Sequence, residues 1–262
     1  MKVTDKYNDP IESAKAQAIA QYSAKKTSSV PTEIVDLPSE GRFYPKGHPL
    51  RSGKIEMRYM TAYDEDILTN ASYIRNGVVI DRLLQELITT SNISYDDILN
   101  CDRDALIIAA RILSYGKIYD VSITSPNDSK LSLKRSIDLS KLDLKKSLLP
   151  ADENGLCEYK SDKYIIKFKF LTIKEQQVVM SSTKPLFEFL IQSIVSINGE
   201  TNIEKNKEYL QYNMLAIDSK IVRKYITDNM PTMDLICTFE DEVGGVFTAG
   251  FQAGSDFFYP EF

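Results

Sequence analysis

Few side chains in this sequence have the type and spacing that acid–base, nucleophilic or metal chemistry needs. The only histidine, His48, lies among prolines and glycines, and no serine has the flanking pattern of an activated nucleophile. Cys101, Cys157 and Cys237 are far apart and none belongs to a CxxC pair, so free thiols are expected and not a zinc site. The sequence therefore predicts no metal, no cofactor and no catalytic residue.

Acidic residues and one glycine pair are the other candidates for chemistry. Residues 64–66 could bind a hard cation, but they follow Thr61 at the start of a helical pattern, where carboxylates cap the helix. Residues 96–97 resemble a second helix start. Residues 244–245 lack the Lys-Ser/Thr of a phosphate loop, and a hairpin turn accounts for them. A hydrolase would need two carboxylates in one cleft, which the sequence does not indicate.

Composition argues against other classes of partner. The net charge is -5 and the pI is about 5.2, so no global basic field attracts nucleic acid. The local basic stretch at 130–146 is interrupted by Asp138 and Asp143 and has no aromatic residue for base stacking. No apolar run approaches the roughly 20 residues of a membrane span, and the polar start predicts a cytosolic product. We therefore expect protein partners, with no nucleic acid, membrane or small-molecule substrate.

The elements that must position any site appear first after residue 53. Residues 54–60 alternate polar and apolar side chains, which is typical of a half-buried strand. Thr61 then caps a helix, and apolar faces predict further helices over 78–88 and 102–113. Two alternating runs, 118–124 and 131–137, flank a polar tip and predict a hairpin.

A similar order begins again after residue 155. It consists of a strand at 164–171, a cap at Thr172, helices at 186–195 and 218–226, and strands at 233–239 and 246–251. The sequence predicts an α+β fold with two tandem similar strand-helix-helix-hairpin subdomains, 53–150 and 156–253, joined by a linker at 148–155. The alternative is that unrelated strand-helix units resemble each other by chance.

Three further segments surround these subdomains. An N-terminal arm, 1–33, is expected to be flexible or ordered by a partner, and a Pro/Gly loop, 34–52, to cover the core or to bind a partner. The aromatic C-terminal tail, 254–262, is expected to dock on its own chain or on another subunit. The candidate partner-binding residues are Phe43, Tyr44, Phe257, Phe258, Tyr259 and Phe262.

Several motifs carry a family resemblance. The segments 37–45 (LPSEGRFYP), 58–70 (RYMTAYDEDILTN), 113–121 and 257–260 occur in an order that resembles the T4 bacteriophage baseplate protein family, from about residue 34 to the end. Some relatives carry cysteines around a proline at the first hairpin tip, similar to a zinc-ribbon turn. This chain has residues 125–129 (SPNDS) there, so the metal is not carried over.

The resemblance implies a function. Members of that family build the baseplate hub of a contractile phage tail, so the resemblance implies a non-catalytic hub subunit or hub-assembly factor that binds other tail proteins. It implies a location in the host cytoplasm during assembly, with retention in the virion left open. The alternatives are a transient chaperone that is absent from the mature virion and, less favoured, a tail-associated hydrolase.

Overall fold

The computed structural model describes residues 30–127, 131–251 and 255–258. The chain divides after Pro31, and residues 32–262 form one compact unit. The first half of that unit contains β1 (Thr32–Asp36), η1 (Pro49–Ser52), β2 (Lys54–Arg58), α2 (Ala62–Leu68), α3 (Ala71–Arg75), α4 (Val79–Leu87), η2 (Tyr95–Asp97), η3 (Asn100–Asp102), α5 (Arg103–Tyr115), β3 (Ile118–Thr124), β4 (Ser132–Asp138), η4 (Leu139–Lys141) and β5 (Leu144–Lys145).

The second half contains β6 (Cys157–Lys160), β7 (Ile165–Phe168), α6 (Ile173–Ser181), α7 (Pro185–Ser193), β8 (Ile194–Ile197), α8 (Ile203–Tyr212), α9 (Ala216–Asp228), β9 (Thr232–Met233), β10 (Ile236–Glu240), β11 (Val246–Gly250) and η5 (Ser255–Phe258). All strands lie in small antiparallel sheets: β1–β2, β3–β4, β5–β9, β6–β7–β8 and β10–β11. The α+β fold is confirmed.

The two predicted threonine caps share one contact, a hydrogen bond from the threonine N–H to the carboxylate three residues later. At the start of α2, Asp64 accepts hydrogen bonds from the Thr61 N–H and hydroxyl, and it also pairs with Arg58 at 2.7 Å. At the start of α6, Glu175 accepts a hydrogen bond from the Thr172 N–H and pairs with Lys169. In both places a basic residue six positions before the carboxylate ties the end of a strand to the first turn of a helix.

The order of elements after each cap is also similar. Ile88, just after α4, forms a bridge to Met57, and Ile194, just after α7, pairs with Phe168 of β7. Each half then ends in a 13-residue helix, α5 or α9, followed by a hairpin. These correspondences agree with a duplicated unit, and the duplication itself stays a prediction.

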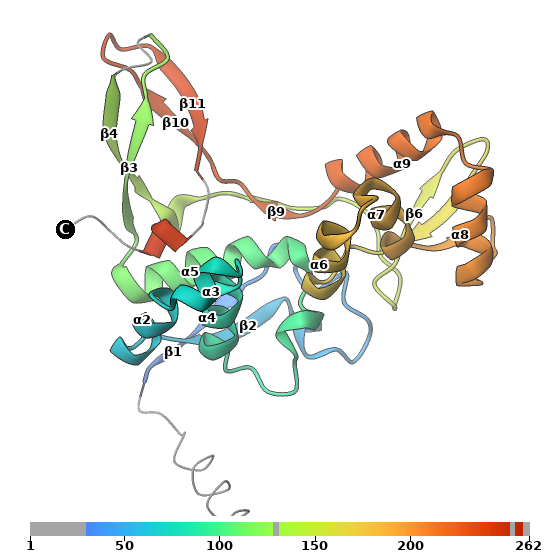
Figure 1. The fold of residues 1–262 in the computed structure, drawn as a ribbon, viewed down its shortest axis with the longest axis horizontal. Helices are drawn as coiled ribbons and strands as arrows, with labels where there is room; N and C mark the ends of the chain where they lie inside the picture. Colours follow the sequence, from blue (N-terminus) through green and yellow to red (C-terminus); the bar gives the residue numbers. More distant parts are fainter. Residues whose placement is uncertain (1–29, 128–130, 252–254, 259–262) are drawn as a thin grey trace, which may run out of the picture. The chain divides into compact units, whose positions relative to one another are not determined.

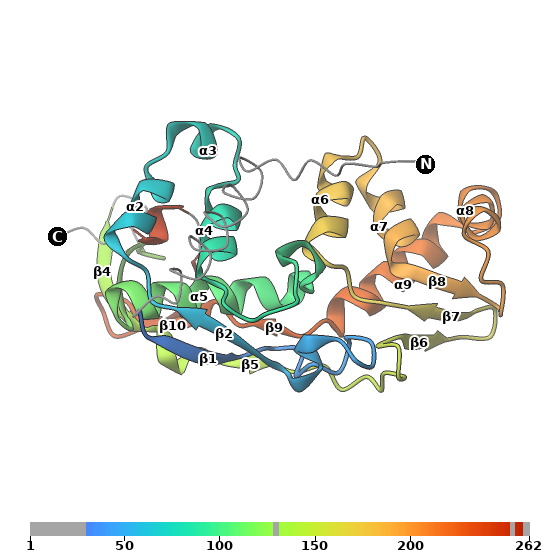
Figure 2. The ribbon, with the colours of Figure 1, turned by 90° about the horizontal axis from the view of Figure 1, so that it is seen from below.

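The two halves share one core. One hydrophobic cluster contains buried residues of both, from Leu37 to Phe258. The Asn100 N–H donates to Leu171 O, and the Ile173 N–H donates to Ile98 O, both at 2.8 Å. Helix α5 lies between the β1–β2 pair and helices α2–α4 (Figure 2). The predicted subdomains are therefore joined by backbone hydrogen bonds and a common apolar interior.

The structure differs from the predicted elements in several places. Helix α8 and strand β6 lie where the sequence predicts no element, and the strand predicted at 233–239 is divided into β9 and β10. Residues 32–36, which the sequence divides between arm and loop, form strand β1, and Thr32 pairs with Arg58 of β2. The strand is exposed along most of its length and has only two large apolar residues, so its pattern is weak. The helix predicted over 186–195 ends at Ser193, because Ile194 and its successors pair with β7 as β8.

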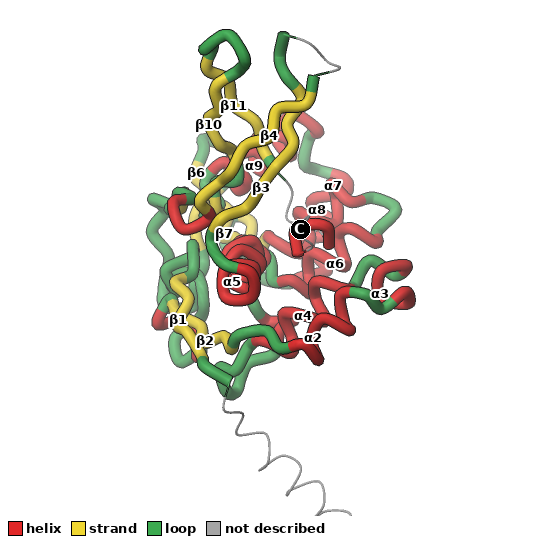
Figure 3. Tube along the Cα trace, turned by 90° about the vertical axis from the view of Figure 1, so that its left-hand side faces the viewer, coloured by secondary structure: helices red, strands yellow, loops and turns green. Residues whose placement is uncertain are grey.

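The β3–β4 and β10–β11 hairpins stand next to each other (Figures 1 and 3). Near their tips the Ser125 hydroxyl donates to Glu242 at 2.9 Å, and Arg135 donates to the Glu240 carbonyl at 2.7 Å. Their facing sides carry apolar residues that belong to or pack against the core, among them Val121, Ile137 and Phe239. These two hairpins, residues 118–127 with 131–138 and residues 236–250, form the hairpin pair.

Candidate partner-binding site

The Pro/Gly loop is fixed against the core. Leu37, Phe43, Tyr44 and Leu50 are all buried. The ring of Phe43 meets Phe170 of the second half edge-on, with 4.7 Å between centroids. The four apolar side chains of the loop therefore lie in the core, and binding of a partner by this loop stays a prediction.

A buried carboxylate organises the loop. Asp102 accepts hydrogen bonds of 2.8 Å from the Ser39 N–H, the Ser39 hydroxyl and the Tyr44 hydroxyl. The Tyr44 oxygen in turn accepts one from the Leu99 N–H at 3.0 Å. Burial raises the pKa of Asp102 to about 6, against the opposing effect of these donors, and burial also raises the pKa of Tyr44. The serine of the LPSEG motif thus serves as a structural anchor.

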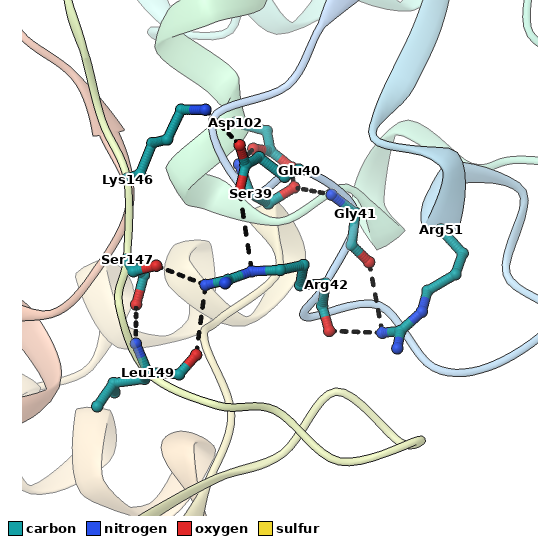
Figure 4. A network of polar contacts seen from close by, with 9 residues as sticks. All are labelled: Ser39, Glu40, Gly41, Arg42, Arg51, Asp102, Lys146, Ser147 and Leu149. Carbon is teal, nitrogen blue, oxygen red and sulfur yellow. Dashed lines mark hydrogen bonds and ion pairs between the residues drawn. The ribbon is translucent and has the colours of Figure 1, made fainter.

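Basic side chains fix the loop against residues 146–149, where the predicted linker begins (Figure 4). The Arg42 guanidinium donates to the carbonyls of Ser147 and Leu149, and Lys146 pairs with Glu40. The Lys146 ammonium lowers the pKa of Glu40. Residues 147–149 are therefore tied to the loop by charge-assisted hydrogen bonds.

The sequence's candidates for chemistry have structural partners. The His48 ring nitrogen Nδ1 accepts a hydrogen bond from the Leu50 N–H at 3.2 Å, and the ring stacks on Tyr44; burial lowers its pKa. Burial opposes ionisation of Asp64, but the Arg58 and Thr61 hydrogen bonds outweigh it and lower its pKa. Within residues 30–127, 131–251 and 255–258, no three His, Cys, Asp or Glu side chains are placed to hold a metal ion.

Two rings of the C-terminal tail are buried in their own chain. Phe257 and Phe258 are 1% and 0% exposed. Phe257 meets Tyr119 of β3 edge-on at 4.7 Å, and its carbonyl accepts a hydrogen bond of 3.0 Å from Nε of Arg111 on α5. Arg111 also donates to the Gly116 carbonyl. Its guanidinium lies within 6.0 Å of the Tyr115, Tyr119 and Phe257 rings.

Of the six candidate partner-binding residues, four therefore contact their own chain in this structure: Phe43, Tyr44, Phe257 and Phe258. Tyr259 and Phe262 lie outside the described residues. Binding of a partner by these six residues stays a prediction. The structure adds Asp102 and Arg111, which the sequence reasoning missed as organising residues. For Arg111 the sequence did contain a signal, because it is the single charged residue in the apolar run 105–113. A helix that is apolar all round is buried, so a charge within it needs partners.

The tight turns of the loop give a testable prediction. Gly41 and Gly47 both have positive φ, but a Cβ on Gly41 would lie 2.4 Å from the Arg51 carbonyl oxygen, whereas a Cβ on Gly47 would meet nothing within 4 Å. We expect Gly47→Ala to cost about 1–2 kcal/mol of unfolding free energy from backbone strain alone. Gly41→Ala should cost at least about 2 kcal/mol more, because the backbone must also move. Urea unfolding measures both, and equal losses would contradict the close packing of this turn.

No helix in the part of the chain that the structure describes is long and apolar enough to cross a membrane. A family model described as T4 bacteriophage base plate protein matches residues 31–249. The match begins within one residue of β1 and ends inside β11, so it includes both halves and both hairpins. The chain matches no curated protein and no solved structure.

Proposed function

Because this chain belongs to the T4 bacteriophage base plate protein family, we propose that it is a hub subunit or hub-assembly factor of a contractile phage tail. It acts by binding other tail proteins and carries out no reaction. The observation that carries the proposal is the family match over residues 31–249, which includes nearly the whole described chain. Family membership itself implies a structural or assembly role in the tail.

The interior of the protein supports a role without catalysis. The side chains that most often do chemistry hold the fold together here, since His48 caps a turn, Asp64 caps α2 and Asp102 holds the Pro/Gly loop. Burial raises the pKa of the thiols of Cys101, Cys157 and Cys237, which disfavours the reactive thiolate. A hydrolase would need two carboxylates facing one cleft at glycosidase spacing, and the sequence does not indicate such a pair.

A hub subunit and the alternative, a transient chaperone, differ in where the protein ends up. A hub subunit remains in the finished tail, whereas a transient chaperone leaves before completion. Immunoblotting of purified mature tails is expected to detect the chain in a fixed ratio to a known baseplate protein. Absence from tails, together with presence in assembly intermediates, would favour the chaperone. A zymogram on cell walls with the purified protein tests the hydrolase alternative, and a cleared zone would contradict the proposal.

A further inference from the structure

The hairpin pair has strand edges whose hydrogen-bonding groups point outward. In β3–β4, the Ser125 N–H donates to Leu131 O and the Leu139 N–H donates to Lys117 O, which identifies the hydrogen-bonded pairs at both ends of the ladder. Because such pairs alternate in an antiparallel ladder, Ile118, Asp120, Ser122 and Thr124 direct their N–H and C=O groups away from β4. Among the described residues, β3 has no strand partner on that side.

This free edge faces a groove. The groove has a volume of about 1000 Å³ and is lined by the whole of β3, by part of β4, by Phe239 of β10, by Ala249 and Gly250 of β11, and by Phe251 just after it. Its lining residues come from both hairpins, whose backbones Figure 3 shows. Its apolar surface includes Val121, Ile123 and Phe251, which are only partly buried. An extended segment placed there would gain backbone hydrogen bonds on one side and apolar contact on the other.

Charge distinguishes this groove from the one on the other side of the hairpin pair. The β3 groove is lined by three cations, Arg111, Lys134 and Arg135, and by a single carboxylate, Asp120, which accepts a hydrogen bond from Ser136. The groove between β4 and β10, of about 570 Å³, has two cations and four carboxylates, namely Arg135, Lys141, Asp138, Asp143, Asp234 and Glu240. An acidic segment is therefore attracted to the β3 side and repelled from the β4 side.

The side-chain pattern of the ligand follows from the pleat. Tyr119, Val121 and Ile123 face the second hairpin, whereas Ser122 lies on the opposite face with Lys134 as its cross-strand neighbour. A strand added to β3 would therefore place alternate residues toward the apolar side and toward Lys134. The edge itself carries no proline and no lysine, and its single charged residue is Asp120, whose carboxylate accepts a hydrogen bond from Ser136.

We propose that the groove beside β3 binds an extended segment of a neighbouring tail protein by strand addition, and that this segment alternates apolar and acidic residues. The proposal rests on the proposed function, because it takes a tail protein as the partner. It assigns the contact to the β3 edge and not to the aromatic tail, whose two described rings are buried.

The test uses the full chain labelled with 15N and a nine-residue peptide in which valine and glutamate alternate. We expect saturable binding, with amide shifts concentrated at Ile118, Asp120, Ser122 and Thr124. Ser122→Pro should weaken binding at least tenfold, because the proline removes an outward N–H without breaking a bond to β4. Ser132→Pro is the matched control, since Ser132 also points outward but lies on the β4 edge; it should change affinity less than twofold.

The charge of the peptide provides a second test of the groove, which does not depend on a proline substitution. A peptide with lysine in place of glutamate should bind at least tenfold more weakly. In the Lys134→Glu variant, the affinity ratio between the glutamate and lysine peptides should become smaller or reverse. Equal affinity in the S122P and S132P variants, shifts confined to the β1 or β11 edge, or no saturable binding of the glutamate peptide would overturn the proposal. These readouts use purified protein, so their failure leaves the baseplate role, which the tail immunoblot tests, unaffected.

Discussion

Replacing Asp102 with alanine is expected to lower the free energy of unfolding by about 3–5 kcal/mol at pH 7. The carboxylate accepts three buried hydrogen bonds, and without it the Ser39 and Tyr44 donors lose their acceptor where water cannot replace it. The Pro/Gly loop would then lose its attachment to the start of α5. Urea unfolding at equilibrium measures the loss. Asp97→Ala is the control, because Asp97 is an exposed carboxylate in the same segment; it should change stability by less than about 0.5 kcal/mol.

The pH dependence gives an independent check on Asp102. The pKa of the Asp102 carboxyl is about 6 in the folded protein, whereas its ordinary value is 3.8. The folded state therefore binds the proton more tightly than the unfolded state does. The stabilisation from this proton is complete below pH 4 and is lost as the pH rises through 6. The stability of the wild type relative to Asp102→Asn should therefore fall by about 2–3 kcal/mol between pH 4 and pH 7. A pH-independent difference would contradict the buried environment of this carboxyl.

Replacing Arg111 with methionine is expected to cost about 3–4 kcal/mol and to release the C-terminal segment from α5. Methionine retains much of the apolar packing of the stem, but the Phe257 and Gly116 carbonyls lose their donors and three aromatic rings lose a cation. Limited proteolysis should then cut near the C-terminus at protease concentrations that leave the wild type intact. Arg82→Met, at an exposed position on α4, should have little effect.

A double-mutant cycle locates the cause. Arg111→Met and Phe257→Ala remove parts of the same contact, so the double variant should lose at least about 1 kcal/mol less than the sum of the single losses. If the losses of unfolding free energy are additive, Arg111 does not hold the tail. The same conclusion follows if R111M protects the C-terminus from proteolysis as well as the wild type does.

The sequence predicted elements well where the signal was local. The strand, threonine cap and acidic first turn at 54–66 recur at 165–175, because capping and amphipathic spacing depend on residues within a few positions of each other. The hairpins at 118–138 and 236–250 were predicted for the same reason. The boundary at 194 was wrong because Ile194, Val195 and Ile197 fit a helix face as well as a buried strand.

Long-range contacts could not be read in the same way. Ser39 and Asp102 are 63 residues apart, and nothing in the sequence near either position indicates the other. Arg111 and Phe257 are 146 residues apart. Phe257 and Phe258 of the tail are buried, in agreement with its aromatic composition, but composition alone did not select the chain's own helix α5 as their neighbour.

Assembly of tails in cells tests the central claim, that this chain serves the baseplate through contact along its hairpin pair. A phage that encodes the chain would carry S122P or S132P in its place, and the yield of complete tails would be counted by electron microscopy. We expect a large loss of tails with S122P, although the purified variant melts normally, and a normal yield with S132P. Equal yields from the two phages would contradict it.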